Sequence, residues 1–219
     1  MKEYLNVLKN CPLFFNVSEE NMIILLNCLG AKINCYDKKF TVFSEGDIAK
    51  YIGIILSGSV QIQQIDYYGN RTILDNITKG QIFAEEFACS GAIPLPVSAI
   101  ATEHTEIMFV DCDHILHTCK NTCAFHQQLI FNLIKGLANK TVSFHQKIGI
   151  TSKRSTRDKL MSYLLIESKK AKSNAFDIPF DRQELADYLE VERSGLSAEI
   201  SKLRNEGIIE SNKNHFKIL

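Results

Sequence analysis

The 219-residue sequence has no long apolar run and no excess of charge of either sign. No stretch approaches the roughly 18 apolar residues that a membrane-spanning helix needs. The first residues, MKEYLNVLKNC, are charged and lack the apolar segment of a signal peptide. Lys plus Arg and Asp plus Glu number 25 each, so net charge points to no partner. The sequence therefore predicts a cytoplasmic protein without a membrane partner.

The cysteines lack the even count and the spacing of a disulfide framework. There are seven, scattered along the chain, and in a reducing compartment most should be small buried apolar residues. Cys11, Cys28 and Cys35 are separated by 16 and 6 residues, which does not match an iron–sulfur site. Cys119, Cys123 and His126 would share one helix face and could bind zinc or haem, but simple packing of the cysteines is the favoured explanation.

Catalytic signatures are also missing. The sequence shows no nucleophile–base set, no Walker loop and no dinucleotide fingerprint. A cupin-like metalloenzyme would need clustered His and Glu ligands on strands, but the β-rich segment holds only His104. An enzyme is therefore the least favoured class, and no cofactor is expected.

Hydrophobic periodicity divides the chain into a β-rich part between helical parts. Residues 1–35 are helical in pattern, with Gly30 placed to end a helix. From Lys32 to Asp111, short β-rich runs such as SVQIQQI alternate with turn signals. Evenly spaced short strands over about 80 residues suggest an antiparallel sandwich or barrel. From His114 to Ile150 the period becomes helical again.

The second helical region carries a heptad seam. Its apolar positions follow alternating spacings of four and three: Ile130, Ile134, Leu137, Thr141, Phe144 and Ile148. One helix cannot bury such a stripe alone. The seam must pack on the chain's own β domain, on a second copy of the chain, or on both.

Two short helices near the C-terminus are separated by a tight turn. Asp181 can cap the first helix, with Glu184 completing a capping box. Glu190-Val191 interrupts the helical pattern, and a second helix follows with Leu196, Ile200 and Leu203 facing inward. Gly207 ends that helix, and GIIESNKNHFKIL closes the chain as a hairpin. This order of elements predicts a winged helix-turn-helix.

The second helix leaves a polar, positively charged face for solvent. Its outward residues are Arg193, Ser194, Ser197, Ala198 and Lys202. An arginine can reach guanine O6/N7 or a phosphate in the major groove, and a lysine near the helix end suits phosphate. Any helical hairpin on a protein surface shows some residues of this kind, so spacing alone leaves both interpretations open.

The stretch RQELADYLEVERSGLSAEISKLRNEGII resembles the recognition segment of the CRP/FNR family of bacterial transcription regulators. The resemblance covers nearly the whole chain and implies an α+β fold. It implies a cyclic-nucleotide-binding-like antiparallel β-barrel or jelly roll at 1–115, a dimerisation helix at 116–150 and a winged helix-turn-helix at 151–219. The DNA-binding residues implied are Arg182, Gln183, Arg193, Ser194, Gly195, Ser197, Ala198 and Lys202.

Three positions depart from the family's recognition pattern. The family often has Glu at Ser194 and Arg at Ala198, so two of its base contacts are absent here. Its turn usually holds Gly at Glu190. A non-Gly residue there either takes a costly left-handed conformation or shifts the turn. The operator sequence should therefore differ from those of better-known relatives.

The stretch GQIFAEEFACSGAIPLPVSAIA, Gly80 to Ala101, is similar to the family's phosphate-binding cassette. It keeps Gly80 and Glu85 but has Ala84 at the second glycine, Leu95 at the phosphate-binding arginine and Pro96 at the Ser/Thr. Without that arginine, the site loses a charge-assisted pair and should not bind cyclic AMP tightly. The pocket could take an uncharged or apolar ligand, or these residues could be core. Candidate lining residues are Gly80, Phe83, Ala84, Glu85, Phe87, Leu95, Pro96 and Ile100.

The resemblance implies a homodimer on a two-fold operator, with half-sites about 34 Å apart. An unidentified effector would favour one arrangement of the two DNA-binding domains over the other. RNA polymerase is a further candidate partner. The alternative is a metal-, haem- or redox-responsive regulator of the same fold that uses the group at Cys119, Cys123 and His126.

Overall fold

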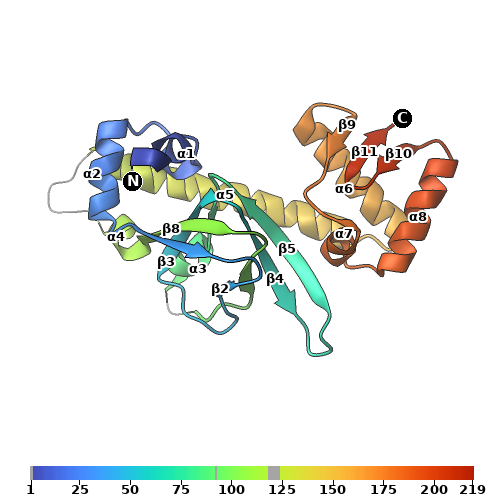
Figure 1. Ribbon diagram of the computed structural model, residues 1–219, viewed down its shortest axis with the longest axis horizontal. Helices are drawn as coiled ribbons and strands as arrows, with labels where there is room; N and C mark the ends of the chain where they lie inside the picture. The colour runs from blue at the N-terminus through green and yellow to red at the C-terminus, as the bar shows by residue number, and fades with distance from the viewer. Residues whose placement is uncertain (1, 92, 118–123) are drawn as a thin grey trace. The chain divides into compact units, whose positions relative to one another are not determined.

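The computed structural model describes residues 2–91, 93–117 and 124–219 (Figure 1). The chain forms two compact units. The first comprises Met1–Gly69 and Leu74–Thr141, and the second comprises Asn70–Ile73 and Val142–Leu219. Among the described residues, no helix is both long and apolar enough to cross a membrane.

Short helices open the first unit. They are η1 (Lys2–Tyr4), α1 (Leu5–Lys9), η2 (Pro12–Phe14) and α2 (Glu19–Cys28). The Ser18 side chain caps α2 by accepting a hydrogen bond from the Asn21 backbone N–H at 3.4 Å. Gly30 follows the helix with a positive φ of 60°, which suits glycine. The helical pattern predicted for 1–35 therefore ends earlier, and Lys32–Tyr36 is already the first strand.

Two four-stranded sheets follow, and all of their strands lie in the first unit except the start of β5, whose residues Arg71–Ile73 belong to the second unit (Figure 1). The first sheet has the order β1 (Lys32–Tyr36), β8 (Thr105–Asp111), β3 (Tyr51–Ser57), β6 (Ile82–Phe83). The second has the order β2 (Thr41–Phe43), β7 (Ser98–Ala101), β4 (Ser59–Ile65), β5 (Arg71–Thr78). The expected antiparallel β domain is confirmed, and its strands divide between two sheets instead of closing into one.

Apolar side chains from strands and helices make one core in this unit. Ile54 and Val110 of the first sheet are fully buried, as are Leu25 and Leu26 of α2. Leu129 of the long helix α5 (Ala124–Thr151) belongs to the same cluster. Full burial of one such side chain contributes about 1.5–3 kcal/mol, so these contacts fix the first part of α5 within the first unit.

Two short helices precede α5. Helix α3 (Glu85–Ser90) follows β6, and α4 (Cys112–Leu116) follows β8. His117 then has extended backbone angles, φ −99° and ψ 104°, which end α4. The continuous helical pattern predicted from His114, with the dimerisation helix at 116–150, is therefore wrong at its start. The long helix is described from Ala124 and runs to Thr151.

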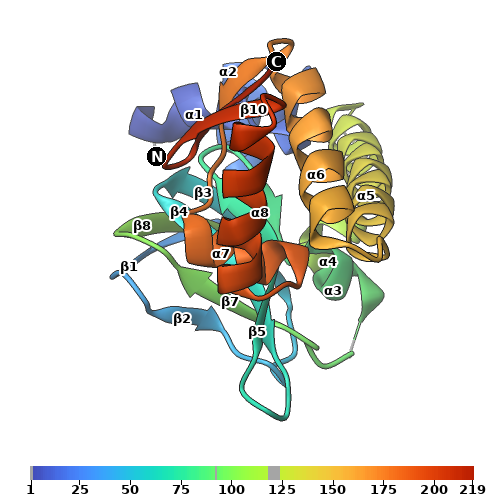
Figure 2. The same cartoon turned by 90° about the vertical axis from the view of Figure 1, so that its right-hand side faces the viewer.

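The second unit has the predicted winged helix-turn-helix (Figure 2). Its elements are α6 (Thr156–Ala171), β9 (Ala175–Asp177), α7 (Arg182–Leu189), α8 (Arg193–Asn205), β10 (Ile209–Asn212) and β11 (His215–Ile218). The three strands form a small sheet in the order β10-β11-β9. Helix α8 lies at the front of this unit in Figure 2.

Local chemistry sets the two-helix geometry. The Asp181 carboxylate accepts a hydrogen bond from the Glu184 N–H at 2.8 Å, and Glu184 accepts one from the Asp181 N–H at 2.9 Å. This reciprocal pair is the capping box that the sequence predicts. Glu190 takes the left-handed conformation, φ 55° and ψ 56°, which is the first of the two outcomes expected for a non-Gly residue at this turn. Gly207, at φ 70°, follows the end of α8 as predicted.

Candidate functional site

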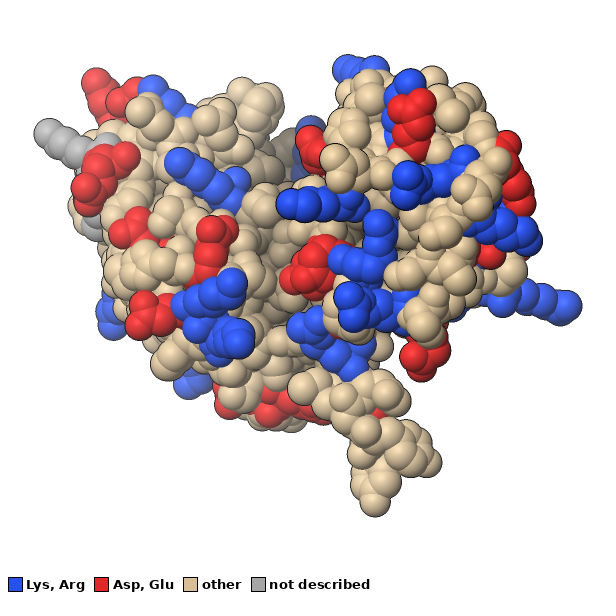
Figure 3. Space-filling view, turned by 45° about the vertical axis from the view of Figure 1, so that its right-hand side comes forward, with Lys and Arg blue, Asp and Glu red and all other residues tan. Residues whose placement is uncertain are grey.

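Helix α8 has one buried face and one exposed face. Leu196, Ile200 and Leu203 are at most 4% exposed and join the core of the second unit. The opposite face leaves these predicted DNA-binding residues exposed: Arg193, Ser194, Gly195, Ala198 and Lys202. Ser197 is half-buried. Lys and Arg side chains gather on the molecular face that Figure 3 shows.

The two predicted contact residues on α7 differ in accessibility. Gln183 is exposed, and its amide donates a hydrogen bond to Asp187 at 2.8 Å, one helical turn away. Arg182 is half-buried. Its guanidinium donates to the Lys213 carbonyl at 3.4 Å and lies 5.6 Å from the centre of the Phe216 ring. Burial lowers the pKa of Arg182. Arg182 therefore ties α7 to the hairpin, in addition to any contact with DNA.

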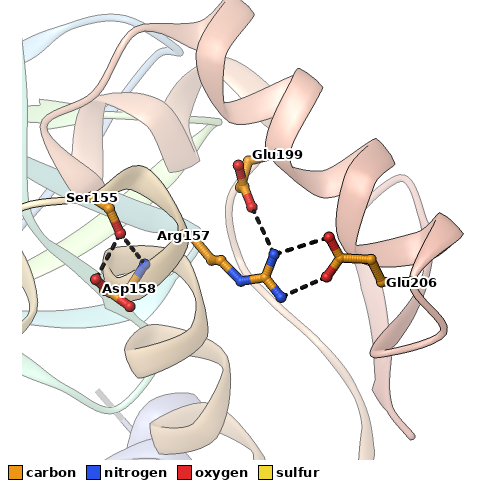
Figure 4. A network of polar contacts seen from close by, with 5 residues as sticks. All are labelled: Ser155, Arg157, Asp158, Glu199 and Glu206. Carbon is orange, nitrogen blue, oxygen red and sulfur yellow. Dashed lines mark hydrogen bonds and ion pairs between the residues drawn. The ribbon is translucent and has the colours of Figure 1, made fainter.

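A salt-bridge network anchors α8 to α6 (Figure 4). Arg157 of α6 points toward α8 and donates two hydrogen bonds to the Glu206 carboxylate, at 3.2 and 2.6 Å. It also donates to Glu199 at 3.5 Å. The hydrogen bond from Arg157 lowers the pKa of Glu206, and the same bond raises the pKa of Arg157. A planar guanidinium bound at two oxygens fixes direction as well as distance, so this network sets the position of α8.

Charged groups also hold α7 in place. Lys159 of α6 donates to the Leu189 and Glu190 carbonyls, at 3.2 and 3.1 Å, and so caps the C-terminal end of α7. Asp187 accepts two hydrogen bonds from the Arg71 guanidinium, the closer pair of atoms at 2.5 Å. Helix α7 is thus held by side chains from α6 and from the start of β5.

Helix α5 exposes part of the predicted heptad seam. Ile134 and Ile148 are each 61% exposed, and Phe144 is 38% exposed. Thr141 is also exposed. Ile130 and Leu137 are half-buried and pack against the core of the first unit. The seam thus serves two purposes within one helix, because two members contact the chain's own β domain while four face outward.

The predicted effector pocket is small and apolar. Phe83, Ala84, Phe87 and Leu95 line a cavity beside α3, together with residues that the sequence analysis did not select: Phe43, Ile62, Glu86, Val97 and Ala99. Gly80, Glu85, Pro96 and Ile100 do not line this cavity. The volume open to the centre of a water molecule is about 10 Å³, close to the room needed for one water and far below that of a ligand pocket.

Glu85 points to the long helix instead of to the cavity. It is 2% exposed, and its Oε1 accepts a hydrogen bond from Lys140 Nζ of α5 at 3.1 Å. Lys140 also donates to Glu86 at 2.8 Å. Burial raises the pKa of Glu85, and the Lys140 ammonium offsets only part of that effect. Burial acts to lower the pKa of Lys140, but the two carboxylates outweigh it and raise that pKa overall.

The backbone of the cassette keeps a conformation that suits glycine. Ala84, at the position of the family's second glycine, has a φ of 64° and a ψ of 7° directly before α3. A left-handed alanine costs roughly 1–2 kcal/mol, which the packing around α3 must outweigh. Ala84 therefore takes a left-handed turn directly before α3, and the carboxylate of Glu85, which follows it, is bound by Lys140.

Two family models match the chain in the order that the fold shows. A cyclic nucleotide-binding domain matches residues 34–122, and a Crp-like helix-turn-helix domain matches residues 158–219. The chain has the CRP/FNR-type transcription-regulator fold. The resemblance of the recognition segment and of the cassette is thereby confirmed at the level of family and fold.

Solved structures of CRP/FNR-type regulators superpose on most of the chain at low sequence identity. The c-di-GMP-responsive global regulator CLP of Xanthomonas campestris is 16% identical, with a TM-score of 0.73 over 91% of this chain and 99% of CLP. A CRP/FNR-family transcriptional regulator of Thermus thermophilus is 18% identical, with a TM-score of 0.61 over 86% of this chain and 93% of its own.

A curated relative is a much longer protein. Rat cGMP-dependent protein kinase 2 is 22% identical over 208 residues, which are 94% of this chain and 27% of the kinase. The CRP/FNR-type chain thus spans about a quarter of the length of that kinase.

The structure tests the proposed metal-binding group only in part. Cys119 and Cys123 lie outside the described residues. His126 is 3% exposed, and its Nε2 lies 2.8 Å from the Ile115 carbonyl, to which it donates a hydrogen bond. Within residues 2–91, 93–117 and 124–219, no group of three His, Cys, Asp or Glu side chains is placed to hold a metal ion.

Sequence reasoning missed three charged residues, each of which ties helices together within its own unit of the CRP/FNR-type fold. Arg157, Lys159 and Lys140 were not selected, because their partners lie 30 to 55 residues away in sequence. Lys213 was also not selected as a candidate contact residue. It is exposed at the tip between β10 and β11, and the predicted hairpin already placed it there.

Proposed function

We propose that the chain is a DNA-binding transcription regulator that binds a two-fold operator as a homodimer. The observation that carries the proposal is the exposed face of α8, where Arg193, Ser194 and Lys202 project from a helix with a fully packed inner face. Such a helix fits the major groove, which is about 12 Å wide. The network of Arg157 holds it at a fixed angle to α6.

Arg193, the first residue of α8, is the proposed base reader. A guanidinium at a helix N-terminus can donate two parallel hydrogen bonds to guanine O6 and N7. Lys202 lies near the other end of the helix, and Lys213 lies at the hairpin tip, so both suit phosphates that flank the groove. The rest of the proposed contact surface is Ser194, Gly195, Ser197 and Ala198, together with Gln183 and, through its hairpin contact, Arg182.

DNA selection with the full-length chain tests this assignment. Genomic fragments bound by the purified protein yield the operator, and its affinity is then compared for the wild type and Arg193→Ala. We expect the substitution to lower operator affinity by about 1–3 kcal/mol, which is roughly five- to 150-fold. Binding to unrelated DNA should change much less, because that binding depends on total charge.

A matched control removes the same charge elsewhere in the unit. Lys169 is exposed near the C-terminal end of α6, so Lys169→Ala should leave operator affinity almost unchanged. Equal losses from Arg193→Ala and Lys169→Ala would show that only net charge matters. Unaltered operator binding by Arg193→Ala would overturn the role of α8.

The dimer part of the proposal rests on α5. Its exposed apolar residues include Phe131 and Val142, at 61% and 56%, in addition to the outward seam residues Ile134, Phe144 and Ile148. A second copy of the same helix offers a complementary apolar stripe, as in a coiled coil. Pairing along α5 would place two α8 helices in one particle, which a two-fold operator requires.

The first unit is the proposed sensor unit, and its proposed effector is an unidentified one other than cyclic AMP. Leu95 stands at the family's arginine position and is 3% exposed, so no cation is offered to a phosphate there. Glu85 is bound by Lys140, and the cavity is about the size of one water molecule. Calorimetric titration with cyclic AMP should therefore show no high-affinity heat. Sub-micromolar binding would overturn this assignment.

The same proposal makes the chain a non-enzymatic regulator. A Crp-like helix-turn-helix model accounts for residues 158–219, a region that a cupin-like enzyme would not share. If the regulator activates transcription, RNA polymerase is a further proposed partner.

A further inference from the structure

Two thiols of the first unit lie in direct contact. The Sγ atoms of Cys89 and Cys112 are 3.2 Å apart, and both cysteines are free. Cys89 lies in α3, and Cys112 is the first residue of α4. They are 23 residues apart in sequence and lie in two different helices. A covalent S–S bond is about 2.05 Å long, so a movement of roughly 1 Å would join them.

The two thiols differ in accessibility and in proton affinity. Cys89 is half-buried, whereas Cys112 is 1% exposed. A hydrogen bond from the Cys112 thiol lowers the pKa of Cys89, and the same contact raises the pKa of Cys112. The accessible sulfur is thus the better nucleophile, and the buried sulfur stands behind it. This is the arrangement of an attacking and a resolving cysteine.

The other cysteines of the described residues have different surroundings. Cys11 is buried, and burial raises its pKa to about 12, which makes it unreactive. Cys28 and Cys35 are exposed and belong to α2 and β1. Cys28 and Cys35 therefore serve as internal controls, because they are exposed thiols without the contact that joins Cys89 and Cys112.

We propose that Cys89 and Cys112 form a reversible dithiol–disulfide site that peroxide oxidises. The Cys89 thiolate attacks one peroxide oxygen, the O–O bond breaks, and Cys89 becomes a sulfenic acid while hydroxide leaves and takes up a proton. The Cys112 sulfur then attacks Cys89 Sγ, the S–O bond breaks, and water leaves with the Cys112 proton. The two thiols lose two electrons and two protons, and the peroxide is reduced to two water molecules.

The disulfide would fix the helix that contacts α5. Helix α3 carries Glu85 and Glu86, which bind Lys140 of α5 at 3.1 and 2.8 Å. A bond from Cys89 to Cys112 ties the other end of α3 to α4 and closes the loop between them. The oxidised chain therefore holds α3 at both ends, by the ion pairs at one and by the disulfide at the other. This site differs from the group at Cys119, Cys123 and His126.

Peptide mapping of the full-length protein tests the site. Reduced protein is treated with one equivalent of hydrogen peroxide, alkylated and digested under non-reducing conditions. Trypsin alone leaves Gly80–Lys120 in one peptide, because no Lys or Arg lies inside it. A second protease that cleaves after Glu separates Phe87–Glu103 from Ile107–Lys120. We expect these two peptides to be joined by a disulfide that dithiothreitol reverses, before Cys28 and Cys35 are oxidised.

Variants assign the bond to its two sulfurs. The second peptide also contains Cys119, so the link must persist in Cys119→Ser and disappear in Cys112→Ser. In Cys112→Ser, Cys89 should accumulate as a sulfenic acid that dimedone traps. Wild-type Phe87–Glu103 that stays unlinked while Cys28 and Cys35 react would overturn the proposal. A link that is lost in Cys119→Ser, or that joins two chains, would overturn it as well.

Discussion

The two units differ in the surroundings of a charged residue at the start of a helix. In the first unit, Glu85 follows the left-handed residue Ala84 at the start of α3, and it is buried against Lys140. In the C-terminal unit, Arg193 starts a helix whose charged side is open to solvent. At these two helix starts, Glu85 is paired with a cation inside the first unit, whereas the Arg193 side chain is left exposed.

The difference shows that a shared backbone conformation does not fix the chemistry beside it. Ala84 and Glu190 both take a left-handed backbone without being glycine, one directly before α3 and the other directly after α7. The side chains beside the two turns have different surroundings. Arg193 at the start of α8 is exposed, whereas Leu95 beside the small cavity is buried and Glu85 is bound by Lys140 of another helix.

The largest expected effect comes from removing Lys140, the cation that is paired with Glu85 inside the first unit. Lys140→Met leaves Glu85 buried without its counter-charge, and breaking a buried ion pair in this way costs about 3 kcal/mol of the free energy of unfolding. Glu85→Gln in the same background should restore a large part of that loss, because the neutral amide needs no cation. Urea unfolding at pH 7 of the wild type, the single variant and the double variant measures both effects.

Acid should partly rescue Lys140→Met. Burial raises the pKa of Glu85 above its ordinary value of 4.5, and removal of the ammonium raises it further. The folded state then binds a proton more tightly than the unfolded state, so the free energy of unfolding increases as the pH falls from the raised folded pKa toward 4.5. If the variant's loss of stability were the same at pH 7 and pH 5, Glu85 would not be the buried charge that Lys140 neutralises.

Features set by local chemistry could be predicted from the sequence. The capping box of Asp181 and Glu184 joins residues three apart, and Gly207 ends α8 through its own backbone freedom. Strand β4 was predicted from SVQIQQI, although Gln61 and Gln63 are buried, at 5% and 9% exposure, instead of facing solvent. Alternation locates a strand, but the neighbours on each face decide which residues are buried.

Contacts between distant segments could not be predicted. Lys140 meets Glu85 across 55 residues, and Arg157 meets Glu206 across 49. Both pairs depend on how one helix is rotated against another, which no short motif encodes. The start of α5 was also missed, because the extended backbone at His117 has no glycine or proline to mark it. The size of the cavity depends on how its apolar lining packs, which only the fold shows.

An intermediate effect is expected at the outward face of α5. Ile134 is 61% exposed in the single chain, so Ile134→Asp should leave the folded monomer intact. Across the proposed two-fold seam, the two aspartates would lie against each other and against apolar side chains. We expect the dimer dissociation constant to rise ten- to a hundredfold, or about 1.4–2.8 kcal/mol, in sedimentation experiments.

Asn139 offers a matched control position, because it is exposed on the same helix and lies away from the seam. Asn139→Asp adds the same charge to α5 and should not change the dimer dissociation constant. A dimer that tolerates Ile134→Asp as well would show that the exposed apolar residues of α5 pack elsewhere. Dimer formation would then no longer explain why α5 exposes apolar side chains whereas α8 exposes charged ones.

The smallest expected effect separates the two left-handed positions. Glu190→Gly relieves a conformation that costs a side-chain-bearing residue roughly 1–2 kcal/mol, less the extra entropy that glycine gives the unfolded chain. We expect a net gain of about 0.5–1 kcal/mol, seen as a rise of about 1–4 °C in Tm by scanning calorimetry.

Ala84→Gly relieves the same strain but removes a methyl group on a residue that is 5% exposed, a loss of about 0.8 kcal/mol, so its Tm should barely change. Glu190→Ala is the control, because it removes the charge and keeps the Cβ. A rise in Tm with Glu190→Ala as large as that with Glu190→Gly would assign the effect to the carboxylate and not to the backbone.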